Sequence, residues 1–135
     1  MTMKRFCQAA LVVYTYFIII YMAVLSRGVA KQSRIKMDLL QCYLQPSGIS
    51  HRDIFVNIVG FIPVGFLVGI LSRRHRVLKA FLAGLVLSLA IEGSQLVWKK
   101  GVFDVDDIFN NAVGAVIGGV IAVAVMRIES SCCHG

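Results

Sequence analysis

Four long apolar stretches, at residues 6–25, 54–71, 77–98 and 108–126, alternate with short polar segments along the chain. A helix that crosses a bilayer needs about 20 predominantly apolar residues, and each stretch comes close to that length. The pattern therefore predicts an all-α fold. Residues 1–135 are expected to form a single domain, a compact bundle of four transmembrane helices.

Composition supports lipid as the solvent of this fold. Of the 135 residues, 58% are hydrophobic and only 16% are charged, whereas about a quarter of the residues in a soluble domain are charged. The first stretch follows Lys4 and Arg5, so a signal peptide is the alternative interpretation of it. Its apolar run is longer than the roughly 7 to 15 residues of a signal core, which favours an uncleaved membrane anchor.

Positive charge sets the expected orientation. Lys and Arg divide equally between the two sides of the predicted bundle, but residues 72–79 crowd four of them into the shortest loop. The positive-inside rule acts most reliably on short loops, so this loop and both termini are expected in the cytoplasm. The net charge of +7 then reflects topology and attraction to anionic lipid headgroups. No soluble basic face is left to bind nucleic acid.

The connection between the first two stretches has a pattern of its own. Apolar residues recur at helical spacing between Ile35 and Tyr43, which predicts a short helix lying in the membrane interface over residues 35–43. Ser50 is followed three residues later by Asp53, and this spacing predicts a capping box at the start of the next transmembrane helix.

Polar residues concentrate at three helix ends: the start of the second helix, the end of the third and the start of the fourth. These ends must share one side of the membrane, because the chain reverses at each crossing. Many of the residues are three or four positions apart, so they form stripes that can face a shared interior. They are His51, Asp53, Asn57, Ser88, Glu92, Gln95, Asp104, Asp106, Asp107, Asn110 and Asn111.

Glu92 is the acidic residue whose position is least explained by stabilisation at a helix end. Asp104 is a candidate N-cap of the fourth helix, and Asp106 lies in its first turn, where the helix dipole favours an acid. Glu92 instead lies near a C-terminal end, and a carboxylate at membrane depth costs about 2.5 kcal/mol or more unless it is paired. Asn57 and Asn111 are expected as its hydrogen-bond partners. The alternative to a ligand-binding or chemical role is a structural polar clamp.

Small residues predict where the helices meet. Gly65 and Gly69, and likewise Gly114 and Gly118, are pairs four residues apart, which let helix backbones approach closely in lipid. Pro63 is expected to kink the second helix and to free a carbonyl that a neighbour must satisfy.

Two segments, DIFVNIVGFIPVGFLVGIL and LSLAIEGSQLVWKKGVFDVDDIFNNAVGAVIGG, contain N-x-x-x-F-x-P-x-G-F, S-x-x-I-E-x-x-Q and D-x-x-D-x-x-x-N-x-x-G-x-x-x-G patterns. Over residues 53–123 this combination resembles the VanZ-like family. The chain departs from the family pattern at Val102, where many relatives carry arginine after the glycine; Lys99 and Lys100 are the nearby cations. The matched positions are Asn57, Pro63, Gly65, Glu92, Gln95, Asp104, Asp107, Asn111, Gly114 and Gly118.

The resemblance implies a multi-pass protein of the bacterial plasma membrane, in a family whose founding member is associated with low-level resistance to the glycopeptide teicoplanin. The preferred hypothesis is a non-enzymatic envelope protein with an outward-facing polar cleft. The cleft would bind a lipid-linked or cell-wall-related group or a partner, and no cofactor is expected. Membrane lipids, a cell-wall precursor or glycopeptide, and a second copy of the chain are the expected partners. The ligand-binding candidates are Asn57, Glu92, Gln95, Asp104, Asp107 and Asn111.

Two alternatives stay open. The first is an enzyme acting on an envelope lipid or glycan precursor, with Glu92 as general base and with Asp104 and Asp107 as weak candidates for holding a divalent cation. No nucleophile motif accompanies them, and the DVDD segment lacks the glycine and distal glutamate of an EF-hand loop. The second is a small transporter or flippase with Glu92 as an ion relay. It would have to oligomerise, because four helices offer few walls for a path.

Overall fold

A computed structural model describes residues 3–20, 34–36, 51–97 and 102–132 of the chain. The described residues form four helices, α1 (Met3–Ile20), α3 (His51–Leu71), α4 (Arg76–Val97) and α5 (Val105–Cys132), and two short strands, β1 (Arg34–Lys36) and β2 (Val102–Asp104). The predicted all-α fold is confirmed, since the helices pack together and the strands have only three residues each.

Three of the helices carry apolar segments long enough to cross a membrane. These segments are Ile54–Leu71, Arg76–Gln95 and Val105–Ser131. The apolar part of α1, Arg5–Ile20, is shorter, and its predicted continuation to residue 25 lies outside the described residues, so the fourth span stays a prediction. Large apolar side chains such as Phe55 and Val86, which are 66% and 67% exposed, cover the outside of the bundle. This is the surface of a protein that is solvated by lipid.

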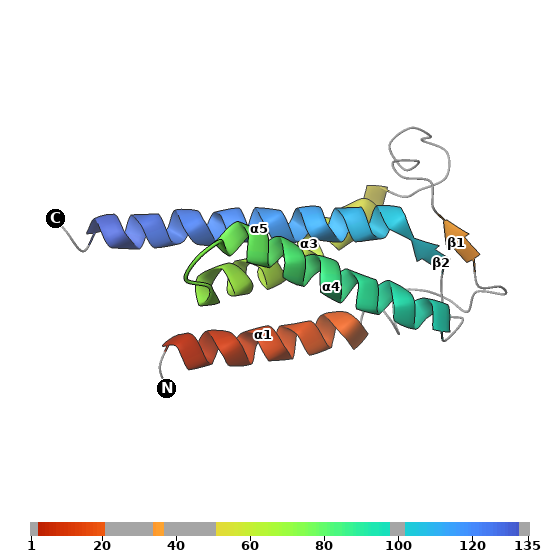
Figure 1. Ribbon diagram of the computed structural model, residues 1–135, viewed down its shortest axis with the longest axis horizontal. Coiled ribbons are helices and arrows are strands. Elements are labelled where there is room, and N and C mark those ends of the chain that lie inside the picture. Colours follow the sequence, from red (N-terminus) through yellow and green to blue (C-terminus); the bar gives the residue numbers. More distant parts are fainter. Residues whose placement is uncertain (1–2, 21–33, 37–50, 98–101, 133–135) are drawn as a thin grey trace.

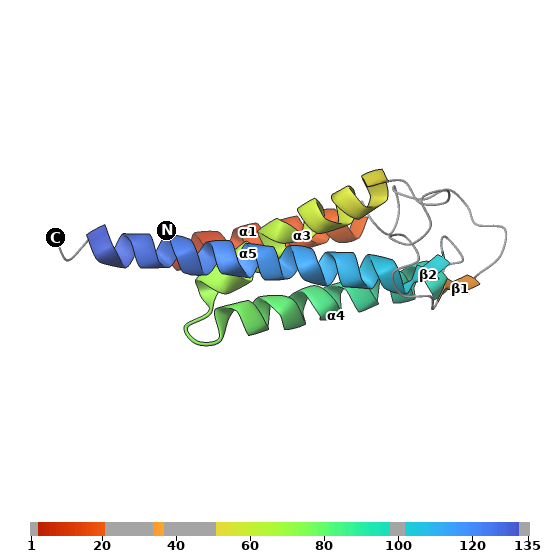
Figure 2. The same cartoon turned by 90° about the horizontal axis from the view of Figure 1, so that it is seen from above.

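The central helix is α5. It packs along α3 and α4, whereas α1 packs on α3 (Figures 1 and 2). A Cβ atom added to Gly65 would overlap the carbonyl oxygen of Ala115, and one added to Gly114 would overlap that of Ile58. The second glycine of each predicted pair lies in the same interface. The small residues therefore let the backbones of α3 and α5 come into direct contact, as the sequence predicts.

A tight turn joins α3 to α4 at the end of the bundle that holds both termini (Figure 1). His75 has a φ of 52°, the left-handed conformation that reverses the chain in few residues. The next residue, Arg76, donates from Nη1 to the carbonyl oxygen of Gly69 at 2.8 Å and also contacts the sulfur atom of Met126. One guanidinium thus connects the end of α3, the start of α4 and the far part of α5.

The two strands correct one prediction. β1 pairs with β2 in parallel, with Arg34 opposite Val102 and Lys36 opposite Asp104, at the end of the bundle opposite the termini (Figure 1). Residues 35 and 36 are therefore extended and do not begin an interfacial helix, because backbone pairing with a segment far along the chain outweighs their local helical spacing. Residues 37–43 lie outside the described residues.

The ends of α3 and α4 and the start of α5 lie within a few residues of the predicted bounds, whereas α5 ends later than predicted. α3 begins at His51 and continues through Pro63; the capping box and the kink stay predictions. α5 runs to Cys132, six residues beyond its predicted end, and the hydroxyls of Ser130 and Ser131 donate to the carbonyl oxygen of Arg127. At 1.5 Å per residue α5 is about 42 Å long, more than the roughly 30 Å of a hydrocarbon core. Its polar last turns can therefore project from the membrane.

Candidate functional site

Buried polar side chains gather where α3, α4 and α5 meet. We call this group the polar cluster, and it includes Asp104, which is half-buried at the start of α5. Its other members are buried although they lie in or beside apolar helices. They are Asn57, Ser88, Glu92, Gln95, Asp106, Asp107, Asn110 and Asn111.

Side-chain hydrogen bonds connect the three helices in pairs. The Asn57 amide on α3 donates to Oδ1 of Asp107 on α5 at 2.7 Å. The Asn111 amide, one turn deeper on α5, donates to Oγ of Ser88 on α4 at 2.8 Å. Polar stripes on separate helices therefore do meet in a shared interior.

Glu92 is tied to the point where β2 becomes α5. Its Oε2 accepts a hydrogen bond from the backbone N–H of Asp104 at 3.1 Å, and only 2% of the residue is exposed. The Asp104 carboxylate in turn accepts from the N–H of Asp106 at 3.1 Å, which confirms the predicted N-cap. A carboxylate of α4 and one of the connecting segment thus hold the start of α5 in place.

The expected pairing of Glu92 with the two carboxamides is wrong. Among the described residues, neither Asn57 nor Asn111 donates to Glu92; they donate to Asp107 and Ser88. These partners differ from the expected ones because the side chains lie at different depths along the bundle. Ser88 lies one helical turn inside Glu92, about 5.4 Å, and this brings its hydroxyl to the level of Asn111, while Glu92 lies level with the chain entering α5.

Asn111 has a buried acceptor atom that forms no hydrogen bond. Oδ1 of Asn111 is buried and makes no hydrogen bond, and the residue is 1% exposed. A buried polar atom without a partner costs about 1–3 kcal/mol, and native proteins contain few of them. Asn111 therefore offers an acceptor that a bound donor group could satisfy.

Asn110 and Asp106 are not among the ligand-binding residues that the sequence predicts, yet both are buried, at 1% and 3% exposed. Their spacing of four residues was the available signal, because it puts them on one face of α5. The helix dipole alone accounts for an acid in the first turn of α5, but the burial of Asp106 shows that it also faces the interior. The side chains of His51 and Asp53 lie outside the described part of the chain.

The weak suggestion of a cation site gains no support. Asp104 caps α5 and Asp107 accepts from Asn57. Within the described ranges, no three His, Cys, Asp or Glu side chains are grouped so that they could hold a metal ion.

Comparison with known proteins gives the family. No solved structure matches the chain. Protein VanZ of Enterococcus faecium is 34% identical over 67 residues, a match that covers 50% of this chain and 42% of that protein. The chain thus matches less than half the length of this relative. The model of the VanZ/LLP1 family matches residues 8–127, which is most of the chain. The chain belongs to the VanZ/LLP1 family of membrane proteins.

Proposed function

We propose that the polar cluster binds a polar group of a lipid-linked or cell-wall-related molecule at the outer face of the bacterial plasma membrane. Binding there lowers the sensitivity of the cell to glycopeptide antibiotics such as teicoplanin. The protein acts by binding and not by turnover. The family and the likeness to protein VanZ support the link to the cell envelope.

The burial of eight polar residues at one end of an apolar bundle carries this proposal. Packing alone does not need them, because two apolar side chains of similar shape are as stable in such positions as a hydrogen-bonded pair. Polar and ionisable residues inside a membrane protein are expensive and mark functional sites. The unpaired Oδ1 atom of Asn111 adds an acceptor that the fold itself leaves unsatisfied.

The chemistry of the cluster limits what it binds. Glu92, Asp106 and Asp107 are carboxylates, which only accept hydrogen bonds when ionised, and the free oxygen of Asn111 also accepts. A partner rich in donors therefore fits best. Sugar hydroxyls, peptide N–H groups and ammonium groups of a cell-wall precursor have this character. A phosphate at the same place would be repelled by the carboxylates.

The test is the teicoplanin concentration that inhibits growth of a susceptible bacterium expressing the protein. We expect the unchanged protein to raise this concentration several-fold. Glu92→Gln keeps an acceptor for the Asp104 N–H but removes the charge, and Asn111→Ala removes the unpaired oxygen. Each should abolish the increase while the amount of protein in the membrane stays the same.

A matched control is available on the same chain. Glu129 is exposed near the C-terminal end of α5, far from the polar cluster, so Glu129→Gln makes the same chemical change outside the site and should leave the inhibitory concentration unchanged. The proposal fails if the unchanged protein gives no increase, or if both cluster variants protect the cell as well as Glu129→Gln does.

A further inference from the structure

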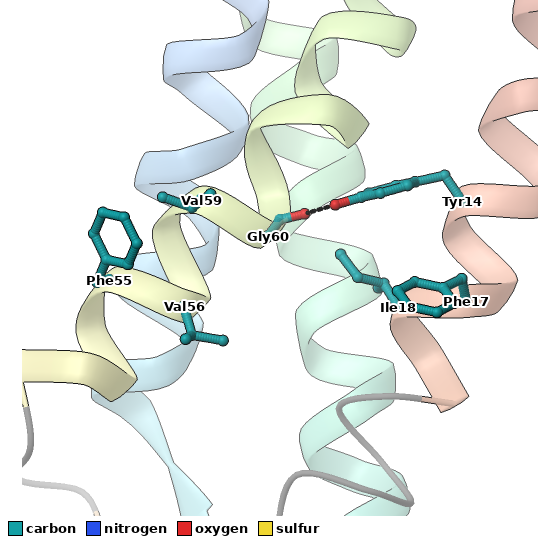
Figure 3. Close-up of a pocket in the computed structure, with 7 residues that line it drawn as sticks. All are labelled: Tyr14, Phe17, Ile18, Phe55, Val56, Val59 and Gly60. Atoms are coloured by element: carbon teal, nitrogen blue, oxygen red, sulfur yellow. Dashed lines mark hydrogen bonds between the residues drawn. The ribbon is translucent and has the colours of Figure 1, made fainter.

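An apolar pocket lies between α1 and α3. It has a volume of about 240 Å³ and is lined by three residues of α1 and four of α3 (Figure 3). An engineered apolar cavity of about 150 Å³ is large enough to bind benzene, so this pocket has room for a segment of hydrocarbon chain. The lining residues are Tyr14, Phe17, Ile18, Phe55, Val56, Val59 and Gly60.

The side chains that line the pocket offer no unpaired hydrogen-bonding group to a bound molecule. The one polar side chain among the lining residues is Tyr14, and its hydroxyl donates to the carbonyl oxygen of Gly60 at 2.9 Å (Figure 3). The other side chains are aliphatic or phenyl groups. A polar occupant would lose its hydration without compensation, whereas each buried methylene gains about 0.8 kcal/mol relative to water.

The pocket is continuous with the surface that contacts the bilayer. Phe17, Phe55 and Val59 form part of its wall and are 61%, 66% and 43% exposed on the outside of the bundle. α3 carries one of the segments able to cross a membrane, so lipid surrounds this opening. A chain can therefore enter sideways from the membrane.

The pocket and the polar cluster share one turn of α3. Val56 lines the pocket on the side of α1, and the next residue, Asn57, donates to Asp107 on the side of α5. The two sites thus lie at the same depth on neighbouring faces of one helix. A molecule with a hydrocarbon chain and a donor-rich head could reach both.

We propose that the pocket holds one hydrocarbon chain of the same amphiphile whose polar head binds the polar cluster. This inference rests on the proposed function and defines its ligand class: a lipid-linked molecule with a hydroxyl- or amide-rich head, held by both parts. α1 contributes to recognition because it encloses the hydrocarbon chain of the ligand against α3.

The probe is a single-chain glycolipid with a sugar head and a photoreactive diazirine in its alkyl chain, added to the protein in phosphatidylglycerol nanodiscs. Illumination should label peptides from α1 and α3, and the labelling should saturate as the glycolipid concentration rises. Val59→Phe fills the pocket, and we expect the glycolipid concentration for half-maximal labelling to rise about tenfold, the effect of losing two methylene contacts. Glu92→Gln should also raise this concentration.

Val86→Phe is the matched control, because Val86 is 67% exposed on α4 and does not line the pocket. It should label like the unchanged protein. If Val59→Phe does not fold, Gly60→Ala narrows the pocket gently, since the added Cβ would lie 3.7 Å from Cδ1 of Ile18. Equal half-maximal concentrations for the unchanged protein and the pocket variant would overturn the inference.

A second probe separates bulk lipid from a dedicated ligand. Phosphatidylglycerol carrying the same diazirine chain should label α1 and α3 weakly and independently of Glu92→Gln. If both probes label equally and Glu92→Gln changes neither, the pocket holds ordinary membrane lipid and the inference is wrong. The proposed function fails separately, through the resistance test, and survives if Glu92→Gln abolishes resistance while Val59→Phe changes no labelling.

Discussion

The carboxylates of the polar cluster have different local surroundings, although they lie close together in the sequence. Asp104, at the end of β2, accepts from a backbone N–H of α5, Glu92 accepts from the backbone N–H of Asp104, and Asp107 accepts from the side chain of Asn57. Only the last of these bonds joins two side chains of separate helices. It is therefore the bond that mutation can test most directly.

Asn57→Ala should lower the free energy of unfolding by about 1–3 kcal/mol, because the buried carboxyl group of Asp107 loses a hydrogen-bond donor. The measurement is reversible unfolding in mixed detergent micelles. Ser130→Ala, which removes an exposed hydroxyl, should change the free energy by less than about 0.5 kcal/mol. A double-mutant cycle of Asn57→Ala and Asp107→Ala should show coupling, and strictly additive effects would contradict the bond.

Residue types and spacing are enough to predict which side chains face the interior of the bundle, but not which of them form hydrogen bonds with one another. The stripes on α3, α4 and α5 identified Asn57, Glu92 and Asn111 as interior residues. Their partners depend on the rotation of each helix and on its shift along the axis, and a shift of one turn moves a side chain by about 5.4 Å. Sequence spacing within one helix contains no information on these shifts between helices.

At the scale of the elements, backbone contact between α3 and α5 is the most constrained feature. A Cβ on Gly114 would overlap the carbonyl oxygen of Ile58, which belongs to backbone and cannot rotate away. Gly93 on α4 is the opposite case, with nothing within 4 Å of an added Cβ. The two glycines are a matched pair for the same substitution.

Gly114→Ala should lower the free energy of unfolding by at least about 1–3 kcal/mol, which is the cost of overpacking a core, or it should prevent the bundle from assembling. Gly93→Ala should leave stability unchanged or raise it by up to about 1 kcal/mol, because alanine favours a helix. Thermal unfolding followed by size-exclusion chromatography in detergent distinguishes the two. Equal melting temperatures for both variants would show that the backbones do not touch.

Helices and strands differ in how far the sequence predicts them. Apolar length predicts α3, α4 and the start of α5 to within a few residues, because apolar length is a local property of the chain. It misses the end of α5, whose last turns are polar. The pairing of Arg34–Lys36 with Val102–Asp104 joins segments distant in the sequence, and a strand of three residues shows no periodicity to detect. Local pattern therefore predicted a helix where long-range pairing makes a strand.

Arg76 offers a test of how the α3–α4 turn is held. Arg76→Gln removes the charged donor to Gly69 O and the contact with Met126, so the free energy of unfolding should fall by about 1.5–3 kcal/mol. Arg73→Gln removes an exposed cation from the same turn and should have an effect below about 0.5 kcal/mol. Equal effects would mean that the loss comes from positive charge alone, and not from these contacts.

In the whole molecule, the two ends of the bundle differ in charge and in secondary structure. One end holds both termini and the basic turn with its exposed Arg73 and Arg74; the other holds the strands (Figure 1). The polar cluster reaches that second end through Asp104, the last residue of β2. The positive-inside rule assigns the basic end to the cytoplasm, and the cluster can meet a cell-wall molecule only if this assignment holds.

Orientation can be measured with a membrane-impermeant maleimide on intact cells. Ser72→Cys, in a chain whose four natural cysteines are replaced by serine, should react only after the membrane is permeabilised, because the basic turn is expected in the cytoplasm. A chain that keeps Cys42 alone should react in intact cells, since this residue lies in the connection between α1 and α3. The opposite result at both positions would place the polar cluster toward the cytoplasm. A cell-wall ligand could not reach it there, so the same labelling decides the topology and a condition of the proposed function.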